Sequence, residues 1–403
     1  MMRTYRILAL FLLVTMLLPF LFACGVADEP VQTTSPGNSE PAVTEQFATE
    51  SDETEPPETT VEATEPEPPV FRNYTATETK DYVKLIGRTR LYKGGFLADW
   101  TASGIEFDYQ GSGNLEFVID RDAKLDVDLI AEVDGTTRRV NVNENGSKIY
   151  RVASNLPDGL HHVMIRRRTL VEDKGVGLLA SIKGIRLCGR FQPKPADNRY
   201  LVAFLGDSIT CGQGLQNNDG LATYAVDFCA RERFDYDICC TSGIGVQFSS
   251  SKHNGAENTM TKHYPFISYY RSSTLRYTPT RQADLVIVNL NTNDQNFGAT
   301  EEPYKENLKT LISEIRAAHG ENVGIVWIVG MMISPDATVN GWLNAVFDEL
   351  GGETAGLYRL IVETNTSGLA SHPDASSHAA VSHALSQFIR DKGLLEVAAE
   401  IPE

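Results

Sequence analysis

A serine stands directly after a run of apolar residues in the middle of the chain, within FLGDSITCGQG at residues 204–214. Ser208 follows Asp207 at the point where the apolar run ends. A serine hydroxyl is a poor nucleophile unless a nearby base takes its proton. Attack on a carbonyl also needs N–H donors for the oxyanion that forms. Because serines are common in turns, Ser208 becomes a candidate nucleophile only if the rest of the chain supplies these partners.

Three other stretches could supply them. SGIG at residues 242–245 offers flexible backbone N–H groups, and NTND at 291–294 carries the side-chain amide of Asn293. SHPD at 371–374 contains a loop histidine, His372, just before the last predicted helix. The first two stretches follow predicted strands. Because the carboxyl ends of parallel strands meet at one edge of a sheet, we expect these groups to gather around Ser208.

The second half of the chain alternates between apolar strands and amphipathic helices, which predicts a doubly wound α/β/α domain at residues 197–395. Such an alternation favours a parallel sheet covered by helices on both faces. The predicted strands cover 199–206, 235–243, 284–292, 322–330 and 358–364, and the predicted helices cover 221–233, 303–320 and 375–393.

Residues 70–190 have a different pattern. Short runs of alternating apolar and polar residues are separated by turn signals such as QGSG, DGTT, NENG and LPDG. Many short strands at this spacing predict an all-β sandwich, of jelly-roll type, in front of the α/β domain.

The N-terminus is typical of an export signal. Arg3 and Arg6 precede an apolar run that is short for a stable membrane span. The run ends in LFAC, which resembles the lipobox of bacterial lipoproteins. The resemblance implies cleavage after residue 23, a lipid anchor at Cys24, and an exported cell-surface lipoprotein held at the membrane. An uncleaved anchor helix is the alternative. Residues 24–69, rich in Thr, Glu and Pro, are predicted to be a disordered linker.

The charge balance argues against nucleic acid as a partner. The formal net charge is −17, and residues 25–69 contribute twelve acidic residues and no Lys or Arg. The remainder is mildly acidic and offers no basic surface.

The cysteines after Cys24 show no metal-ligand spacing, and we interpret them as buried small side chains rather than a disulfide framework. No metal and no organic cofactor are expected. These cysteines are Cys188, Cys211, Cys229, Cys239 and Cys240.

Four short blocks resemble those of the SGNH (GDSL-type) hydrolases, in that family's order: GDSIT at 206–210, SG at 242–243, ND at 293–294 and HP at 372–373. The resemblance implies that Ser208 is the nucleophile and His372 the general base.

The same resemblance assigns the remaining site residues. The backbone N–H groups of Ser208 and Gly243, with the side chain of Asn293, would form the oxyanion hole. Asp207 and Asp294 would support the loops that carry these groups.

A narrower resemblance covers about residues 80–390. GRTRLYKGGFLADWTASGIEFDYQGS, CTSGIGV and YYRSSTLRYTPTRQADLVIVNLNTND are similar to carbohydrate esterase family 2, whose members pair a β-sandwich with an SGNH domain. The resemblance implies a serine esterase that removes O-acetyl groups from xylan or other plant polysaccharides. Two alternatives stay open: an SGNH esterase acting on another acyl ester, such as O-acetylated peptidoglycan, and a glycan-binding lipoprotein whose hydrolase site has decayed.

Two positions depart from the family pattern. Asn291 stands where the third block usually opens with Gly, although Asn tolerates positive φ better than most residues. Leu369 stands where an Asp usually precedes the histidine by three residues. Some family 2 esterases use a Ser–His dyad in which a main-chain carbonyl orients the imidazole, and this sequence resembles that variant. His378 and His383 compete with His372, but both lie within the last predicted helix.

Overall fold

The computed structural model describes residues 70–122, 126–170, 179–268 and 275–397. The predicted signal peptide at 1–23, the lipidation site Cys24 and the acidic linker at 24–69 lie outside the described residues and stay predictions. Within the described ranges, none of the helices combines the length and the apolar character that a membrane crossing requires.

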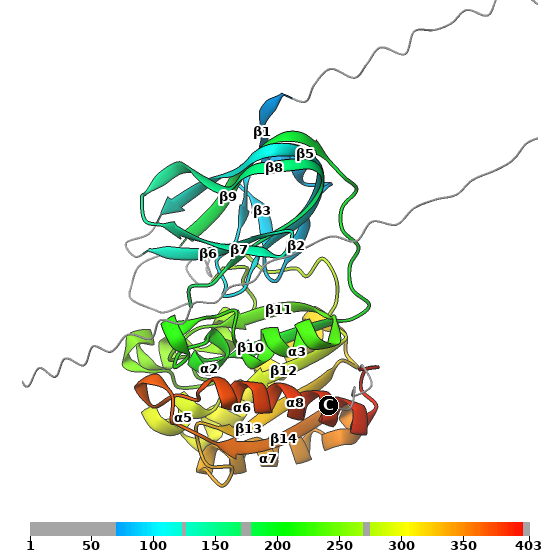
Figure 1. Cartoon of the computed structure of the whole chain (residues 1–403). Helices are drawn as coiled ribbons and strands as arrows, with labels where there is room; N and C mark the ends of the chain where they lie inside the picture. The colour runs from blue at the N-terminus through cyan, green and yellow to red at the C-terminus, as the bar shows by residue number, and fades with distance from the viewer. Residues whose placement is uncertain (1–69, 123–125, 171–178, 269–274, 398–403) are drawn as a thin grey trace, which may run out of the picture. The chain divides into compact units, whose positions relative to one another are not determined.

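The first part of the described chain folds into one antiparallel, nine-stranded sheet, drawn in blue to green in Figure 1. The strand order is β3-β4-β9-β5-β8-β6-β7, with β1 paired to β9 and β2 paired to β5. The predicted all-β fold is therefore confirmed. The strands are β1 (Phe71–Thr75), β2 (Lys84–Ile86), β3 (Arg90–Tyr92), β4 (Gly95–Leu97), β5 (Gly104–Asp122), β6 (Val127–Val133), β7 (Thr136–Val142), β8 (Gly146–Arg167) and β9 (Leu179–Phe191), with a short helix α1 (Ala76–Thr79) after β1.

Two of the predicted turns are not turns. QGSG at 110–113 lies inside β5 and LPDG at 156–159 lies inside β8. These segments face each other, since Gly113 pairs with Leu156, and the register of the two strands shifts there. Bulges of this kind bend a strand pair without ending it. The glycines and the proline therefore mark a bend shared by two long strands rather than the end of either.

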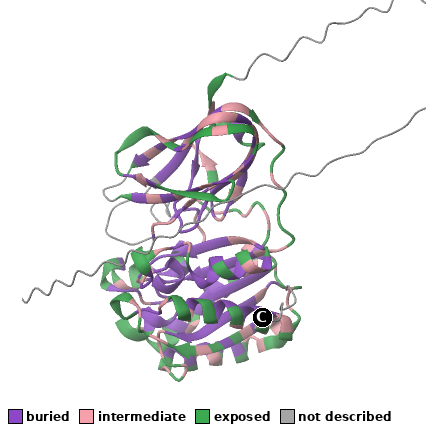
Figure 2. Cartoon of the chain, viewed as in Figure 1, coloured by how far each residue is buried: buried purple, intermediate pink, exposed green. Residues whose placement is uncertain are grey.

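The core of this sheet comes from alternating side chains. In β6 the four residues Val127, Leu129, Ala131 and Val133 are buried and the residues between them are half-buried. This alternation is expected of an antiparallel strand with one face on the core. In Figure 2 the strands of this sheet likewise combine buried residues, in purple, with half-buried or exposed residues, in pink and green.

The second half of the described chain contains a five-stranded parallel sheet in the order β11-β10-β12-β13-β14 (Figure 1). The order reverses at β10, whose two neighbours are β11 and β12, and such a switch point opens a crevice beyond the strand ends. The predicted α/β class is confirmed. The strands are β10 (Leu201–Gly206), β11 (Asp235–Cys240), β12 (Leu285–Asn289), β13 (Gly324–Met331) and β14 (Leu357–Thr364).

Each central strand of this sheet contributes side chains to both faces. In β10, Ala203 and Leu205 belong to one buried cluster, whereas Val202 and Phe204 belong to the other. This explains why the strand is an unbroken apolar run. Helices α4, α6 and α7 cover the first cluster and α2, α3 and α8 the second. The α-helices are α2 (Ser208–Cys211), α3 (Tyr224–Glu232), α4 (Met260–His263), α5 (Thr292–Phe297), α6 (Glu301–His319), α7 (Thr338–Glu349) and α8 (Ala375–Lys392).

Arg88, in the loop between β2 and β3, joins the two sheets. Its guanidinium is buried, pairs with Asp237 of β11 at 3.2 Å and donates to the carbonyl oxygen of Tyr264 at 2.7 Å. The indole N–H of Trp100 donates to the carbonyl oxygen of Ile267 at 2.7 Å. Removing one partner of a buried charge pair leaves the other charge buried without a counter-charge, which is strongly destabilising. These contacts therefore hold the loop between β2 and β3 against β11.

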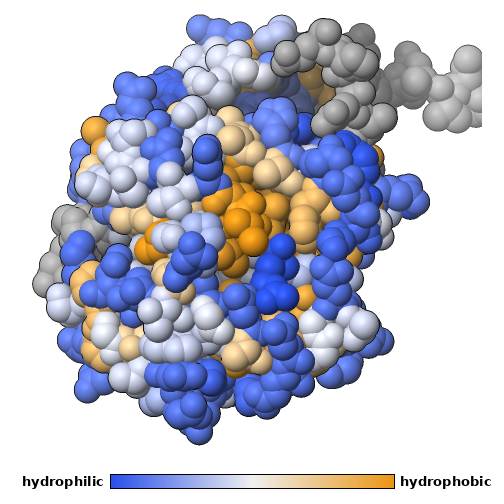
Figure 3. Space-filling view, turned by 90° about the horizontal axis from the view of Figure 1, so that it is seen from below, coloured by the Kyte–Doolittle hydropathy of each residue, from blue (hydrophilic) through white to orange (hydrophobic). Residues whose placement is uncertain are grey.

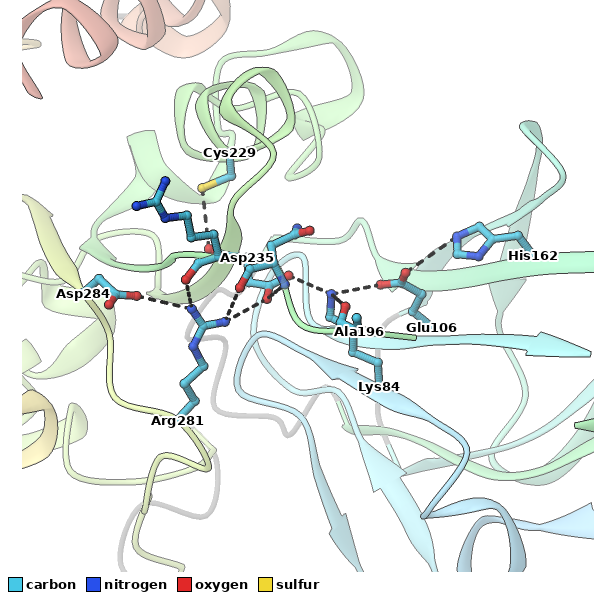
Figure 4. A network of polar contacts seen from close by, with 10 residues as sticks. Lys84, Glu106, His162, Ala196, Cys229, Asp235, Arg281 and Asp284 are labelled. Atoms are coloured by element: carbon cyan, nitrogen blue, oxygen red, sulfur yellow. Dashed lines mark hydrogen bonds and ion pairs between the residues drawn. The ribbon is translucent and has the colours of Figure 1, made fainter. Parts of the chain in front are cut away.

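A second polar network forms around Asp235, the first residue of β11 (Figure 4). Its carboxylate pairs with Lys84 of β2 at 2.8 Å and with Arg281 at 3.2 Å, and it accepts the backbone N–H of Asn198 at 2.8 Å. Lys84 also lies 3.7 Å from Glu106 of β5. This network sits at the amino-terminal start of β11, so it anchors the end of the strand that is remote from Ser242 and Gly243.

The cysteines of the α/β half are buried small side chains, as the sequence predicted. Cys211, Cys229, Cys239 and Cys240 are buried, and Cys188 of β9 is half-buried. Burial raises the pKa of the Cys239 thiol to about 12. Among the described residues, no group of three or more His, Cys, Asp or Glu side chains could hold a metal ion.

Candidate active site

Ser208 is the first residue of α2, two residues beyond the end of β10. Asp207 caps this helix, since its carboxylate accepts the backbone N–H of Ile209 at 3.0 Å. The turn depends on Gly206, because a Cβ there would lie 1.9 Å from the hydroxyl oxygen of Thr210. Ser208 is 5% exposed. The strand, the glycine and the cap together present the serine hydroxyl at the carboxyl edge of the sheet.

The imidazole of His372 meets this hydroxyl. Nε2 of His372 lies 2.9 Å from Oγ of Ser208, and Nδ1 lies 2.8 Å from the carbonyl oxygen of Ala370. A carbonyl can only accept, so Nδ1 carries the hydrogen in the neutral imidazole. Nε2 is therefore left with its lone pair toward the serine, which is the tautomer that a general base requires.

A tight turn sets this geometry. Ala370 and Ser371 have φ of 54° and 57°, in the left-handed region that non-glycine residues rarely adopt. The turn brings the Ala370 carbonyl back onto the ring of His372. Gly214 packs against the base of the same side chain: a Cβ at Gly214 would lie only 2.3 Å from Cβ of His372. The position of His372 is thus fixed from two sides.

The electrostatics of His372 follow from its burial, since it is 7% exposed. Burial disfavours the charged imidazolium and lowers the pKa of His372, an effect that the hydrogen bond to Ala370 partly offsets. Asp374, the nearest acid in sequence, is engaged elsewhere. Its carboxylate accepts the Ser367 hydroxyl at 2.6 Å and caps α8 through the N–H of Ser377 at 2.9 Å. These hydrogen bonds hold the pKa of Asp374 well below its usual range.

The predicted oxyanion residues lie beside the serine loop. Gly243 follows β11 with φ of 91°, and Asn293 is the second residue of α5. The amide nitrogen of Asn293 donates to the carbonyl oxygen of Ile244 at 2.8 Å and to the carboxylate of Asp207 at 3.3 Å. Asn293 therefore links the loop of Gly243 to the loop of Ser208, and the structure brings all four blocks of the predicted site together.

Asp294 braces the loop after Gly243. Its carboxylate accepts the backbone N–H groups of Val246, Gln247 and Phe248, each at 2.8 Å. Burial raises the pKa of Asp294 to about 6, against the opposing effect of these three bonds. Burial also raises the pKa of Asp207 to about 7, with a smaller contribution from the nearby Asp294 charge.

Asn291 occupies the position where the family usually has glycine, and its φ is 90°. Two residues that the sequence did not single out hold it there. Its amide donates to the side-chain oxygen of Asn340 at 2.9 Å, and its own oxygen accepts the Tyr304 hydroxyl at 2.6 Å. The asparagine thus keeps the left-handed turn and gains side-chain anchors that glycine would lack.

The competing histidines lie elsewhere. His378 is buried on α8 and accepts the backbone N–H of Tyr224 at 3.1 Å, and burial lowers its pKa to about 4. His383 is exposed on the same helix. Neither lies against Ser208, so the structure separates His372 from both.

Sequence reasoning missed two further side chains at this edge. The Ser242 hydroxyl donates to the side-chain oxygen of Gln213, and Nε2 of His253 lies 2.7 Å from the carbonyl oxygen of Ser242. No motif indicated His253, because it lies in an irregular segment that reaches Gly243 only through folding.

Comparison with known proteins agrees with this geometry. Residues 204–379 match the model of the GDSL-like lipase/acylhydrolase family, and this range includes Ser208, Gly243, Asn293 and His372. This segment therefore resembles a GDSL-type (SGNH) hydrolase domain in both sequence and site geometry. The resemblance seen in the four sequence blocks is therefore confirmed. A comparison with curated protein sequences gave no match.

Solved structures of carbohydrate esterases share the fold of the SGNH domain and the antiparallel sheet that precedes it. A family two carbohydrate esterase from Clostridium thermocellum, in complex with cellohexaose, is 23% identical, covers 78% of this chain and 100% of its own, and has a TM-score of 0.67. An acetyl xylan esterase from the rumen bacterium Butyrivibrio proteoclasticus is 19% identical, with 81% and 100% covered and a TM-score of 0.70. A family two carbohydrate esterase from Cellvibrio japonicus is 17% identical, with 81% and 99% covered and a TM-score of 0.70.

Proposed function

We propose that the protein is a serine esterase that removes O-acetyl groups from polysaccharides. One observation carries the proposal: Nε2 of His372 lies 2.9 Å from Oγ of Ser208 while Nδ1 is held by the Ala370 carbonyl. A nucleophile, a base in the required tautomer and a group that orients the base form the arrangement needed for acyl transfer.

The reaction proceeds in two halves. Oγ of Ser208 attacks the acetyl carbonyl carbon as its proton passes to Nε2 of His372. The tetrahedral intermediate collapses, the bond to the sugar oxygen breaks, and that oxygen takes the proton from His372, leaving the acetyl group on Ser208. Water then attacks the acetyl-serine, giving a proton to His372. The bond between the acetyl carbon and Oγ of Ser208 breaks, and Oγ takes the proton from His372. Acetic acid leaves and gives its remaining proton to the solvent, which yields acetate.

The oxyanion of both intermediates requires donors that are already in place. The N–H groups of Ser208 and Gly243 and the amide of Asn293 are proposed for this role. One N–H of Asn293 donates to the Ile244 carbonyl at 2.8 Å, so the plane of its amide is set before substrate arrives. The second N–H, which has only the longer 3.3 Å contact with Asp207, is the one proposed for the oxyanion. Such preorganisation lowers the barrier because no donor has to be reoriented during the reaction.

A polysaccharide substrate is supported by the esterases that share this fold, one of them an acetyl xylan esterase and another bound to cellohexaose. Apolar side chains are also exposed on the segments that carry the site. Leu369, three residues before His372, is 60% exposed, and Phe297, at the end of the helix of Asn293, is 45% exposed. Figure 3 shows one face of the molecule on which hydrophobic residues gather among hydrophilic ones.

The test is the release of acetate by purified protein from acetylated xylan and, separately, from O-acetylated peptidoglycan. We expect release from xylan, and a fall of at least about 10³-fold in kcat for Ser208→Ala. Ser147→Ala, which changes an exposed serine of β8, is the matched control and should remain fully active. A folded, active Ser208→Ala variant would refute the mechanism. Acetate release from peptidoglycan but not from xylan would show that the proposed substrate class is wrong, while the proposed mechanism would stand.

A decayed site is disfavoured by the same geometry, because a chain without catalytic constraint has no reason to hold Ser208, His372 and Ala370 in hydrogen-bonding order. Turnover of 4-nitrophenyl acetate separates an enzyme from a glycan-binding protein, since only the former releases 4-nitrophenol catalytically.

The location is a further proposal, and it rests on the sequence of the first 69 residues. We expect the SGNH domain to act outside the cell, attached to the membrane through a lipid on Cys24 and held away from it by the acidic linker. Native protein should partition with membranes, and Cys24→Ala should abolish lipidation. An unmodified, freely soluble native protein with a mature N-terminus elsewhere would contradict this.

A further inference from the structure

His253 is a fully buried histidine that lies against the loop of Gly243. Its Nε2 atom is 2.7 Å from the carbonyl oxygen of Ser242. Since a carbonyl can only accept, Nε2 of His253 carries a hydrogen and donates it. His253 is therefore a hydrogen-bond donor at this position, whereas His372 presents a lone pair from the same ring atom to Ser208.

The carbonyl of Ser242 and the N–H of Gly243 belong to one peptide group. That group is planar, so a bond that fixes the direction of its oxygen also fixes the direction of its N–H. A hydrogen bond accepted by the oxygen also polarises the peptide and strengthens the N–H as a donor. The contact with His253 thus acts on the direction and the strength of the Gly243 N–H.

The packing around Gly243 shows that the segment of His253 is fitted to it. A Cβ at Gly243 would lie 2.5 Å from the hydroxyl oxygen of Ser250 and 3.2 Å from Nε2 of His253. The backbone N–H of Ser250 donates to the Gly243 carbonyl at 2.8 Å. The two peptide groups that flank the Gly243 Cα are therefore both held by residues 250–253.

We propose that His253 is a positioning residue of the oxyanion hole, which orients and polarises the Gly243 N–H through the carbonyl of Ser242. The inference rests on the proposed esterase function, since it presumes that the Gly243 N–H receives the developing oxyanion. His253 touches no reacting atom. Its effect on the rate belongs to the transition state, where negative charge develops on the oxygen, more than to substrate binding.

The variants His253→Leu and His253→Gln separate this role from simple packing. Leucine fills the space but cannot donate, whereas the side-chain amide of glutamine can place an N–H close to the position of the histidine Nε2. We expect kcat for 4-nitrophenyl acetate to fall about 10- to 10²-fold in His253→Leu, less than for outright loss of an oxyanion donor. KM should stay within about twofold. His253→Gln should recover most of the lost kcat.

His319→Leu is the matched control. His319 is also buried and hydrogen-bonded to the backbone, accepting the N–H of Ala283 at 3.1 Å, but this contact lies before the amino-terminal start of β12. It should lower the melting temperature without a fall in kcat. A folded His253→Leu variant with unchanged kcat would overturn the inference, and so would a His253→Gln variant no better than His253→Leu.

If His253→Leu does not fold, His253→Gln is compared with His253→Asn, whose shorter amide cannot reach the Ser242 carbonyl. Glutamine should then exceed asparagine in kcat, and equal values would reject the role. Wild type and Ser208→Ala are assayed alongside. An active wild type with an inactive Ser208→Ala variant upholds the esterase proposal whatever His253 does, whereas an inactive wild type rejects both proposals.

Discussion

Nδ1 of His372 lies 2.8 Å from the carbonyl oxygen of Ala370, two residues earlier in the chain. A main-chain carbonyl fixes the tautomer of the imidazole, as a carboxylate would, but it brings no full negative charge to the imidazolium that forms during attack. The imidazole of His372 is thus oriented by a hydrogen bond to the backbone and not by a paired carboxylate.

The pH dependence of the proposed esterase should reflect this. Burial lowers the pKa of His372 from the ordinary histidine value of 6.5. The base works only when neutral, so activity falls as the pH drops through that lowered pKa. We expect the acid limb of kcat/KM to lie below pH 6.5. An acid limb clearly above it would reveal a carboxylate that raises the pKa of His372.

Asp374 should be dispensable for the chemistry. Asparagine also caps helices well, so Asp374→Asn should change kcat and the pH profile little. Asp374→Ala should lower the melting temperature, because the N–H of Ser377 loses its partner. His372→Ala, measured in parallel, should remove most of the activity. A loss for Asp374→Asn as deep as for His372→Ala would make Asp374 a third catalytic member.

Gly214→Ala should displace the base. A Cβ at this position would lie 2.3 Å from Cβ of His372, and φ is 97°. A shift of about 1 Å in a catalytic group can cost roughly 10²-fold in rate, and we expect a fall of that order in kcat. Gly135→Ala imposes a similar φ strain, 78°, in the β6–β7 turn where nothing lies within 4 Å. It should leave kcat intact, and equal losses in both variants would show that backbone strain alone is responsible.

Asn293→Ala should lower kcat by about 10²–10³-fold, as is usual when one oxyanion donor is removed. KM should change little, because the interaction forms mainly in the transition state. The amide also bridges Ile244 and Asp207, so the melting temperature must be recorded with the kinetics. A change confined to KM would instead assign Asn293 to substrate binding.

The sequence predicted most of the α/β half because its signals are local. Short unbroken apolar runs that alternate with amphipathic helices are typical of strands buried on both faces, and β10 and β12 lie within the predicted ranges. The helix α7 (Thr338–Glu349) was missed, since its sequence TVNGWLNAVFDE contains a glycine and two asparagines that weaken the helical signal.

The antiparallel half shows where local signals mislead. QGSG and LPDG are typical of turns, yet they lie paired inside β5 and β8. Whether glycine and proline end a strand or bend it depends on the strand opposite, and that partner is set by tertiary pairing.

The sequence by itself determined the residue types of the site and, through the order of its strands, that Ser208, Gly243, Asn293 and His372 would meet at one sheet edge. Only the tertiary structure decided which atom of each residue faces which partner. The left-handed turn at Ala370 and Ser371 places a carbonyl, not an acid, on His372. Packing brings His253 onto the peptide before Gly243. Hydrogen bonds act over about 3 Å, so these relationships depend on the folded backbone and not on spacing along the chain.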